Sequence, residues 1–262
     1  MRRLSYCLAF SVGLVAVIST DVNAALQTTP KTTPIASALE STDTVLMANR
    51  LRNRGMSFRV RPSRYRRGGF SRGSCPDGAA PVVPIGEDET VAPAYLTASA
   101  HPTFLINVPE LPDASGVIYV EDPNSPGRNP QVYKATFDIA DQAGIIGIQM
   151  PSEAPMLQEG TTYRWRVVIN CSAEGTEEST IVFSGGEIER VADIEGTREE
   201  RLDYYLQEGI WQETAELIAE YRYDDPSADT DEDWAILMEA SGIPQFAETP
   251  IIEMTNGRLS ED

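Results

Sequence analysis

One stretch near the middle of the chain, residues 157–171 (LQEGTTYRWRVVINC), constrains the fold more than any other. Two sets of side chains alternate along it: Tyr163, Trp165, Val167 and Ile169 against Arg164, Arg166 and, less strictly, Val168. Successive side chains of a β-strand point to opposite faces, so one face of this segment is apolar and the other is polar. The pattern predicts a central strand of a β-sandwich.

The residues before this strand predict a structural corner formed by Leu157, Tyr163 and Trp165. Leu157 precedes Tyr163 by six residues, across a turn that contains Gly160. In this arrangement a tyrosine hydroxyl bonds back to upstream backbone and fixes the passage between two sheets. We therefore expect the Tyr163 hydroxyl to bond to backbone in the preceding turn.

The N-terminus predicts export. A basic start (MRR), an apolar run over residues 4–18 and the small-residue site Val22-Asn23-Ala24 indicate a signal peptide over residues 1–24. No later run approaches the roughly 20 apolar residues of a membrane helix. We expect a protein of the periplasm or the extracellular medium, with the thylakoid lumen as a further alternative, and no transmembrane segment after cleavage.

Cleavage would leave two cysteines, Cys75 and Cys171. In an oxidising compartment an even pair favours a disulfide, and the alternative is two buried thiols. The separation, 171 − 75 = 96 residues, predicts about 4 to 5 kcal/mol of stabilisation from loop closure.

Charge is distributed unevenly along the chain. The net charge is −19, yet residues 1–72 hold 12 basic and 3 acidic residues, which leaves 9 basic and 37 acidic residues, a net of −28, for 73–262. An acidic surface repels phosphate backbones, so nucleic acid is not an expected partner of the folded part.

Residues 25–74 are predicted to form a disordered linker whose second half is rich in arginine. We name this half the cationic arm, for its nine arginines: Arg50, Arg52, Arg54, Arg59, Arg61, Arg64, Arg66, Arg67 and Arg72. Three interpretations stay open for it. The arm is a solvated linker, it lies on an anionic lipid or polysaccharide surface, or it folds back on its own acidic domain.

Beyond Cys75 the sequence alternates between strands and turns. Seven strands are predicted, over residues 94–98, 103–108, 116–121, 132–139, 145–150, 163–171 and 179–190. The links between them are rich in Pro, Gly, Asn and Asp. Short strands with regular turns are typical of a two-sheet sandwich, here of immunoglobulin or fibronectin type III kind, over residues 75–192.

A helical period follows, which makes the chain α+β as a whole. Three amphipathic helices are predicted over residues 193–248, the first with Thr197 and Glu200 as a capping box and the third capped by Thr230 and Asp233. Helices this short need a partner for their apolar faces, so we expect them to pack together or on a sheet. Residues 249–262 are expected to be a flexible tail.

The residues that carry chemistry are few. His101 is the only histidine, and its place before Pro102 at a strand start, with no GxSxG motif in the chain, favours a loop or strand-cap role. A zinc site would need more His or Cys than remain once Cys75 and Cys171 pair. Among 40 acidic residues, pairs of carboxylates arise by chance. No catalytic, cofactor-binding or metal-binding residue is predicted.

One acidic run imitates a calcium loop. Asp229, Asp231 and Asp233 have the right spacing, but the sixth position of the loop holds Trp234, where glycine is required. We interpret the run as the negatively charged N-terminus of a helix.

Two further features have structural interpretations. Gly185-Gly186 is predicted to form a strand bulge rather than a phosphate cradle. The tryptophans are predicted to pack in the core, whereas an exposed Trp165 or Trp211 would indicate sugar stacking.

Several runs taken together resemble a known family: RRGGFSRGSCP, LTASAHPTFLINVPE, VYKATFDI, PMLQEGTTYRWRVVINC, IERV and GIWQETAELIAEYR. In this order they are similar to an uncharacterised secreted family of cyanobacteria, a domain of unknown function, over about residues 66–245. The resemblance implies export, an Arg/Gly segment before a cysteine, a sandwich and a helical C-terminal part, and it implies no activity. Members usually carry an aromatic residue before the IERV strand, where this chain has Glu187.

These observations favour a non-enzymatic protein-binding or envelope-associated module, with an envelope protein or an anionic surface as its partner. The alternative is a carbohydrate-binding or carbohydrate-active protein that uses surface carboxylates and aromatic side chains.

Overall fold

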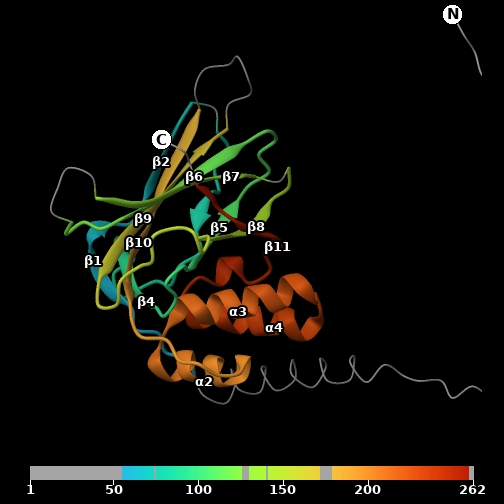
Figure 1. Cartoon of the computed structure of the whole chain (residues 1–262). Coiled ribbons are helices and arrows are strands. Elements are labelled where there is room, and N and C mark those ends of the chain that lie inside the picture. Colours follow the sequence, from blue (N-terminus) through green and yellow to red (C-terminus); the bar gives the residue numbers. More distant parts are fainter. Residues whose placement is uncertain (1–54, 74, 126–129, 140, 172–178, 260–262) are drawn as a thin grey trace, which may run out of the picture.

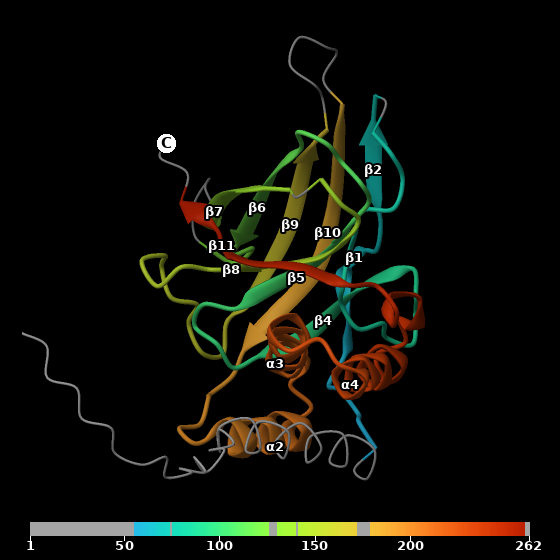
Figure 2. The ribbon, with the colours of Figure 1, turned by 90° about the vertical axis from the view of Figure 1, so that its right-hand side faces the viewer.

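Two β-sheets lie face to face, and three helices lie together at one end of them (Figures 1 and 2). The computed structural model describes residues 55–73, 75–125, 130–139, 141–171 and 179–259. The predicted signal peptide and the first part of the predicted linker, with Arg50, Arg52 and Arg54, lie outside these residues.

The large sheet has the strand order β1-β4-β10-β9-β6-β7-β12, and β2 pairs with β10 beside this path. Its strands are β1 (Arg61–Arg66), β2 (Gly69–Arg72), β4 (Val91–Thr97), β6 (Ser115–Glu121), β7 (Gln131–Asp138), β9 (Thr162–Asn170), β10 (Thr180–Arg190) and β12 (Arg258–Leu259). The small sheet has the order β11-β8-β5-β3. Its strands are β3 (Ala80–Pro81), β5 (Thr103–Val108), β8 (Gly144–Gln149) and β11 (Ile251–Asn256).

All seven predicted strands are present, as β4 to β10, and they lie in two sheets, as the predicted sandwich requires. Along β9 the burial alternates as the sequence predicts, with the Tyr163, Trp165, Val167 and Ile169 side chains buried. The finer likeness to immunoglobulin or fibronectin type III domains stays a prediction. The parallel pairs β10–β4 and β11–β8 depart from the antiparallel sheets of those domains.

A row of aromatic side chains joins the layers. Phe104 on the small sheet meets Trp165 on the large sheet with ring centroids 4.8 Å apart. The Trp165 indole N–H donates to the Tyr95 hydroxyl at 2.8 Å, and the Tyr95 ring packs edge-on against Trp211 on the first turn of α3. Trp165, Trp211 and Trp234 are all buried, as predicted. The core therefore continues from the sandwich into the helices.

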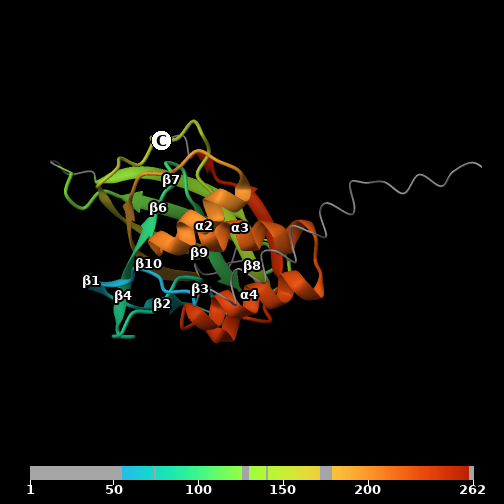
Figure 3. The same ribbon diagram turned by 90° about the horizontal axis from the view of Figure 1, so that it is seen from below.

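The three helices are α2 (Arg198–Glu208), α3 (Trp211–Asp224) and α4 (Ala228–Ala240), and Figure 3 shows them across the end of the sandwich. The predicted capping box of Thr197 and Glu200 is present at α2. The predicted cap of α4 is wrong by three residues. Ser227 is the N-cap, and Thr230 is the third residue of a capping box with it. The helix begins earlier because the Ser227 hydroxyl accepts from the Thr230 N–H while the Thr230 hydroxyl accepts from the Ser227 N–H.

Both ends of the described chain differ from the prediction of linker and tail. Residues 61–72 form β1 and β2, and after the 3-10 turn Pro244–Phe246 the chain returns as β11 in the small sheet and β12 in the large one. The sequence predicts disorder at both ends because composition shows the charge and the few apolar residues of a segment but not the strands with which it pairs. Pairing with β4, β10, β8 and β7 satisfies the backbone groups of these segments instead. In chain order the helices therefore lie between strands of the two sheets, and they are not a tail that follows the last strand.

Candidate functional site

The cationic arm, as far as it is described, lies on its own domain. Its β1 strand pairs with β4, and its arginines contact acidic residues of distant elements. Three ion pairs hold it: Arg59 with Glu208 at 2.9 Å, Arg61 with Glu189, and Arg64 with Glu187 at 3.6 Å. These contacts favour the third of the three interpretations, an arm that folds back. They also place the Glu187 carboxylate next to the Arg64 guanidinium.

The strand that organises the fold presents two stacked arginines on its outer face. The Arg164 guanidinium lies 4.3 Å from the centre of the Tyr65 ring, and that of Arg166 lies 3.9 Å from the centre of the Tyr119 ring. Arg166 Nε also contacts Glu121 Oε1 at 3.3 Å. Stacking on an aromatic face fixes a guanidinium while leaving its edge able to donate hydrogen bonds.

These arginines line a hollow of about 290 Å³ on the large sheet, which we name the arginine hollow. Arg66 and Arg67 lie on the other side, β10 supplies Val182 and Ser184 between them, and Phe70 of β2 completes the lining with its neighbouring glycines. No described acidic residue lines it. In a chain with a net charge of −19, this is a concentrated positive surface.

The register explains why these side chains meet. Strand β10 lies between β9 and β2, and it pairs Ser184 with Arg166, and Val182 with both Val168 and Phe70. Residues paired directly across neighbouring strands share a face, so the β9 arginines and Phe70 face the same side of the sheet. Gly68, between β1 and β2, has a φ of 147°, a conformation that glycine adopts readily. It allows the arm to turn from β4 to β10.

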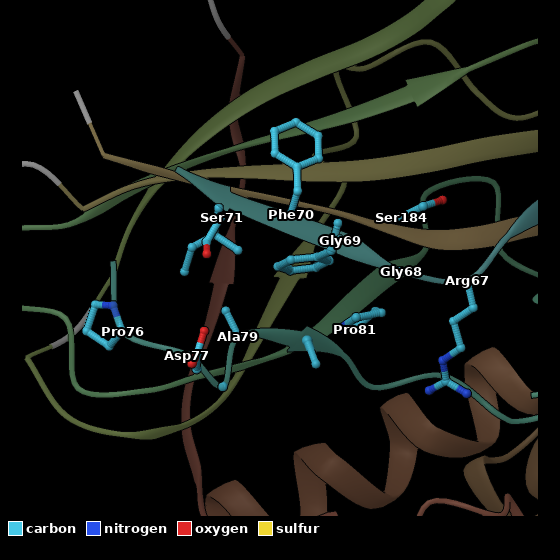
Figure 4. Close-up of a pocket in the computed structure, with 14 residues that line it drawn as sticks. Arg67, Gly68, Gly69, Phe70, Ser71, Pro76, Asp77, Ala79, Pro81 and Ser184 are labelled. Atoms are coloured by element: carbon cyan, nitrogen blue, oxygen red, sulfur yellow. The ribbon is translucent and has the colours of Figure 1, made fainter. Parts of the chain in front are cut away.

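A second pocket, of about 330 Å³, opens on the other side of β2, between β10 and β3. We name it the edge pocket. Figure 4 shows Pro76 and Asp77 at one end and Arg67 at the other, with Phe70 pointing away from Ala79 and Pro81. Ile181 and Phe183 contribute apolar surface to it. The edge pocket thus lies at the edge of the sandwich, and it offers both apolar surface and polar side chains, those of Arg67, Ser71, Asp77 and Ser184.

Arg67 lines both pockets and is only partly exposed. Burial lowers its pKa, and the nearby charge of Glu89 opposes this effect. Within the described residues its guanidinium has no hydrogen bond or ion pair. A cation in this state lacks a compensating anion.

The most strongly perturbed acids lie elsewhere, where α3 meets the sandwich. The buried carboxylate of Glu213 accepts hydrogen bonds from the Thr97 hydroxyl (2.5 Å) and from the N–H groups of Ala98 (2.8 Å) and Ser99 (2.9 Å). Glu216 accepts one from the Thr103 hydroxyl at 2.6 Å. Burial raises the pKa of Glu213, and it raises the pKa of Glu216 to about 8. Both side chains are occupied in fastening α3 to β4 and β5, which is a structural role.

The residues predicted to build the corner and the disulfide are in place. The Gln158 N–H donates to the Tyr163 hydroxyl at 2.8 Å, and the Leu157 side chain is buried. Cys75 and Cys171 form a disulfide with their Cα atoms 5.8 Å apart.

The other sequence candidates have structural surroundings. His101 Nε2 lies 2.9 Å from the Ala154 carbonyl oxygen, a contact between two loops. The register of β10 shifts between Ser184 and Gly186, which confirms the predicted bulge. Asp229 and Asp231 lie in the first turn of α4, as predicted for a helix N-terminus.

The sequence indicates the cationic arm and the outward direction of Arg164 and Arg166. It does not indicate that Arg66 and Arg67 of the arm line the same hollow as these two arginines. Tyr119 was also missed, although its alternation with the buried Ile118 and Val120 places it on the outer face. Within the described residues, no group of three or more His, Cys, Asp or Glu side chains could hold a metal ion. None of the described helices combines the length and apolarity needed to cross a bilayer.

Comparison with known proteins adds a family and no activity. No curated protein matches the chain. The model of DUF928, a domain of unknown function, matches residues 67–251, which include the arginine hollow from Arg67 onward, strands β2 to β10 and the three helices. The match covers well over half of the sequence, and the chain belongs to the DUF928 family.

Proposed function

We propose that the protein is an exported, non-enzymatic binding module that associates with an anionic component of the cell envelope. The observation that carries this proposal is the arginine hollow, a surface of four arginines without an acidic residue in its lining, on a strongly acidic chain. The N-terminal sequence supports export.

The perturbed acids do not offer a competing site. Glu213 and Glu216 are bonded to the strands below α3, and the family match brings no reaction with it. For the carbohydrate alternative, which would use surface carboxylates and aromatic side chains, an exposed Trp165 or Trp211 would have indicated sugar stacking, and both are buried. No observation favours that alternative over the binding module.

The test is co-sedimentation of the chain from Ala25 onward with the native envelope fraction. We expect association at low ionic strength and release at about 0.5 M salt, where screening shortens the reach of charges to a few ångströms. Replacing Arg164→Gln and Arg166→Gln together should reduce the bound fraction several-fold.

A matched control removes two arginines far from the hollow. Arg198 pairs with Glu220 on the helices, and Arg258 pairs with Asp138 on β7. The variant with Arg198→Gln and Arg258→Gln has the same net charge as the test variant and should sediment like the unmodified protein. Binding that ignores salt, or that both double variants lose equally, contradicts the proposal.

A further inference from the structure

We infer that the arginine hollow is a binding site for a dianionic phosphate group carried on an apolar or planar body, a phosphate monoester. This inference deepens the proposed function and rests on it in one respect, that the envelope component would present such a group. The site itself is argued from charge, hydrogen bonding and shape in the described residues.

The first step is the charge of the hollow. Of its four arginines, Arg166 is the one whose guanidinium contacts a described acid, Glu121 at 3.3 Å. Arg66, Arg67 and Arg164 have no ion pair with any described residue. Asp88 and Glu89 influence Arg66 and Arg67 through charge alone, without forming an ion pair. Glu187 and Glu121 lie directly across from Arg164 in the register of the sheet, so the four arginines keep an excess of about two positive charges. This excess is complementary to a dianion rather than to a single carboxylate.

The second step is the state of the donors. The Nε atom of Arg164 is buried and has no hydrogen-bond partner among the residues that the structure describes, although its guanidinium is fixed over the Tyr65 ring. An unsatisfied buried donor costs about 1 to 3 kcal/mol, and more when the group is charged. Arg67 is partly desolvated as well. Phosphate oxygens accept several charge-assisted hydrogen bonds at once and match the planar fork of a guanidinium, so one phosphate would satisfy donors from both walls.

The third step is the shape and the apolar part of the lining. The volume of the hollow is about 290 Å³, roughly ten times the volume of a water molecule in the liquid. This volume is larger than that of a bare phosphate ion. Phe70 on its rim is 53% exposed, one of the few large apolar side chains at the described surface. Val182 lies beside it and is partly exposed. This surface fits a ring or a short aliphatic segment that carries the phosphate.

The test measures binding of phenyl phosphate to the chain from Ala25 onward by isothermal titration calorimetry at low salt. We expect saturable binding at one site, which weakens as salt rises. Benzoate, with one charge, should bind several-fold more weakly, and phenol, with none, should not bind. Inorganic phosphate should bind more weakly than phenyl phosphate because it leaves the Phe70 surface unused.

Two single variants probe the two walls. Arg66→Gln and Arg164→Gln should each weaken phenyl phosphate binding by about tenfold or more, since a charge-assisted hydrogen bond is worth about 1.5 to 3 kcal/mol. Arg258→Gln, on the same sheet and paired with Asp138, should bind like the unmodified protein. Arg66 is exposed, so its variant keeps the test valid if Arg164→Gln unfolds.

Vesicles distinguish the source of the phosphate. Binding to phosphatidylcholine vesicles that contain phosphatidate, in competition with phenyl phosphate, identifies a lipid headgroup. Phenyl phosphate binding without vesicle binding identifies a soluble monoester. Absence of saturable phenyl phosphate binding, or unchanged affinity in both Arg66→Gln and Arg164→Gln, overturns the inference. Salt-sensitive envelope binding without phenyl phosphate binding defeats the inference alone, and the reverse result defeats the proposed function alone.

Discussion

The replacement Glu216→Gln should reduce the pH dependence of stability between pH 5 and 9. Glu216 lies on α3 with its carboxyl group against the Thr103 hydroxyl, and Glu213 and Glu220 add negative charge around it. Burial is the main cause that raises its pKa to about 8 from the ordinary 4.5. The carboxyl group is therefore protonated in the folded protein at neutral pH and ionised in the unfolded chain.

The sign of the effect follows from proton linkage. Below about pH 4.5 both states hold the proton, and the stability is independent of this group. Between 4.5 and 8 the folded state holds more protons than the unfolded state, so the free energy of unfolding falls as pH rises. Above about 8 both states are ionised and the loss is complete. The full difference corresponds to about 5 kcal/mol. Because part of the Glu216 side chain reaches solvent, we expect a loss of about 2 to 5 kcal/mol.

The assay is urea denaturation at pH 5, 7 and 9, followed by the fluorescence of the three buried tryptophans. Glu216→Gln keeps the size of the side chain and its ability to accept from Thr103. Its unfolding free energy should fall less steeply across this range than that of the unmodified protein, and the slope that remains belongs to the buried Glu213. Glu239→Gln, at an exposed position near the end of α4, is the matched control and should keep the full pH dependence. If Glu216→Gln keeps the same slope as the unmodified protein, the assignment of the proton to this group is wrong.

Two further predictions concern the ends of β9. Replacing Cys75 and Cys171 by serine should lower the unfolding free energy by about 4 to 5 kcal/mol through the 96-residue loop; a loss below about 1 kcal/mol in urea denaturation would contradict this. Tyr163→Phe removes the hydroxyl that accepts from the Gln158 N–H, and should cost about 1 kcal/mol, with faster hydrogen exchange at that amide. Unchanged exchange at Gln158 would show that this bond does not hold the corner.

Local patterns were sufficient for the interior of the fold. The period of two along β9, the turn before Tyr163 and the capping box at Thr197 each depend on residues within a few positions of one another. The disulfide could be predicted for another reason, because only two cysteines remain after residue 24. In these cases the sequence contains both partners of the interaction, or leaves a single choice.

The ends of the domain depend on partners that no local pattern reveals. Residues 61–72 are rich in arginine and glycine, a composition typical of solvated chain. Their strand structure depends on β4 and β10 and on an ion pair between Arg61 and Glu189, 128 residues away. The same holds for β11, which gains its parallel partner β8 only after the chain has passed through three helices. The sequence does not predict the position of the arginine hollow, because the hollow depends on the pairing of β2 with the distant strand β10.

The disulfide and the arginine hollow belong to the same structural unit. Strands β2 and β9 supply opposite walls of the hollow and lie on either side of β10. Cys75 follows the end of β2 by three residues, and Cys171 follows β9 directly, so the disulfide joins these two walls at one end. Since β2 contributes only four paired residues, β-pairing alone would hold it weakly. The covalent link therefore keeps Phe70 and Arg67 opposite Arg164 and Arg166, and it explains how a strand of the cationic arm forms part of a binding surface in an otherwise acidic protein.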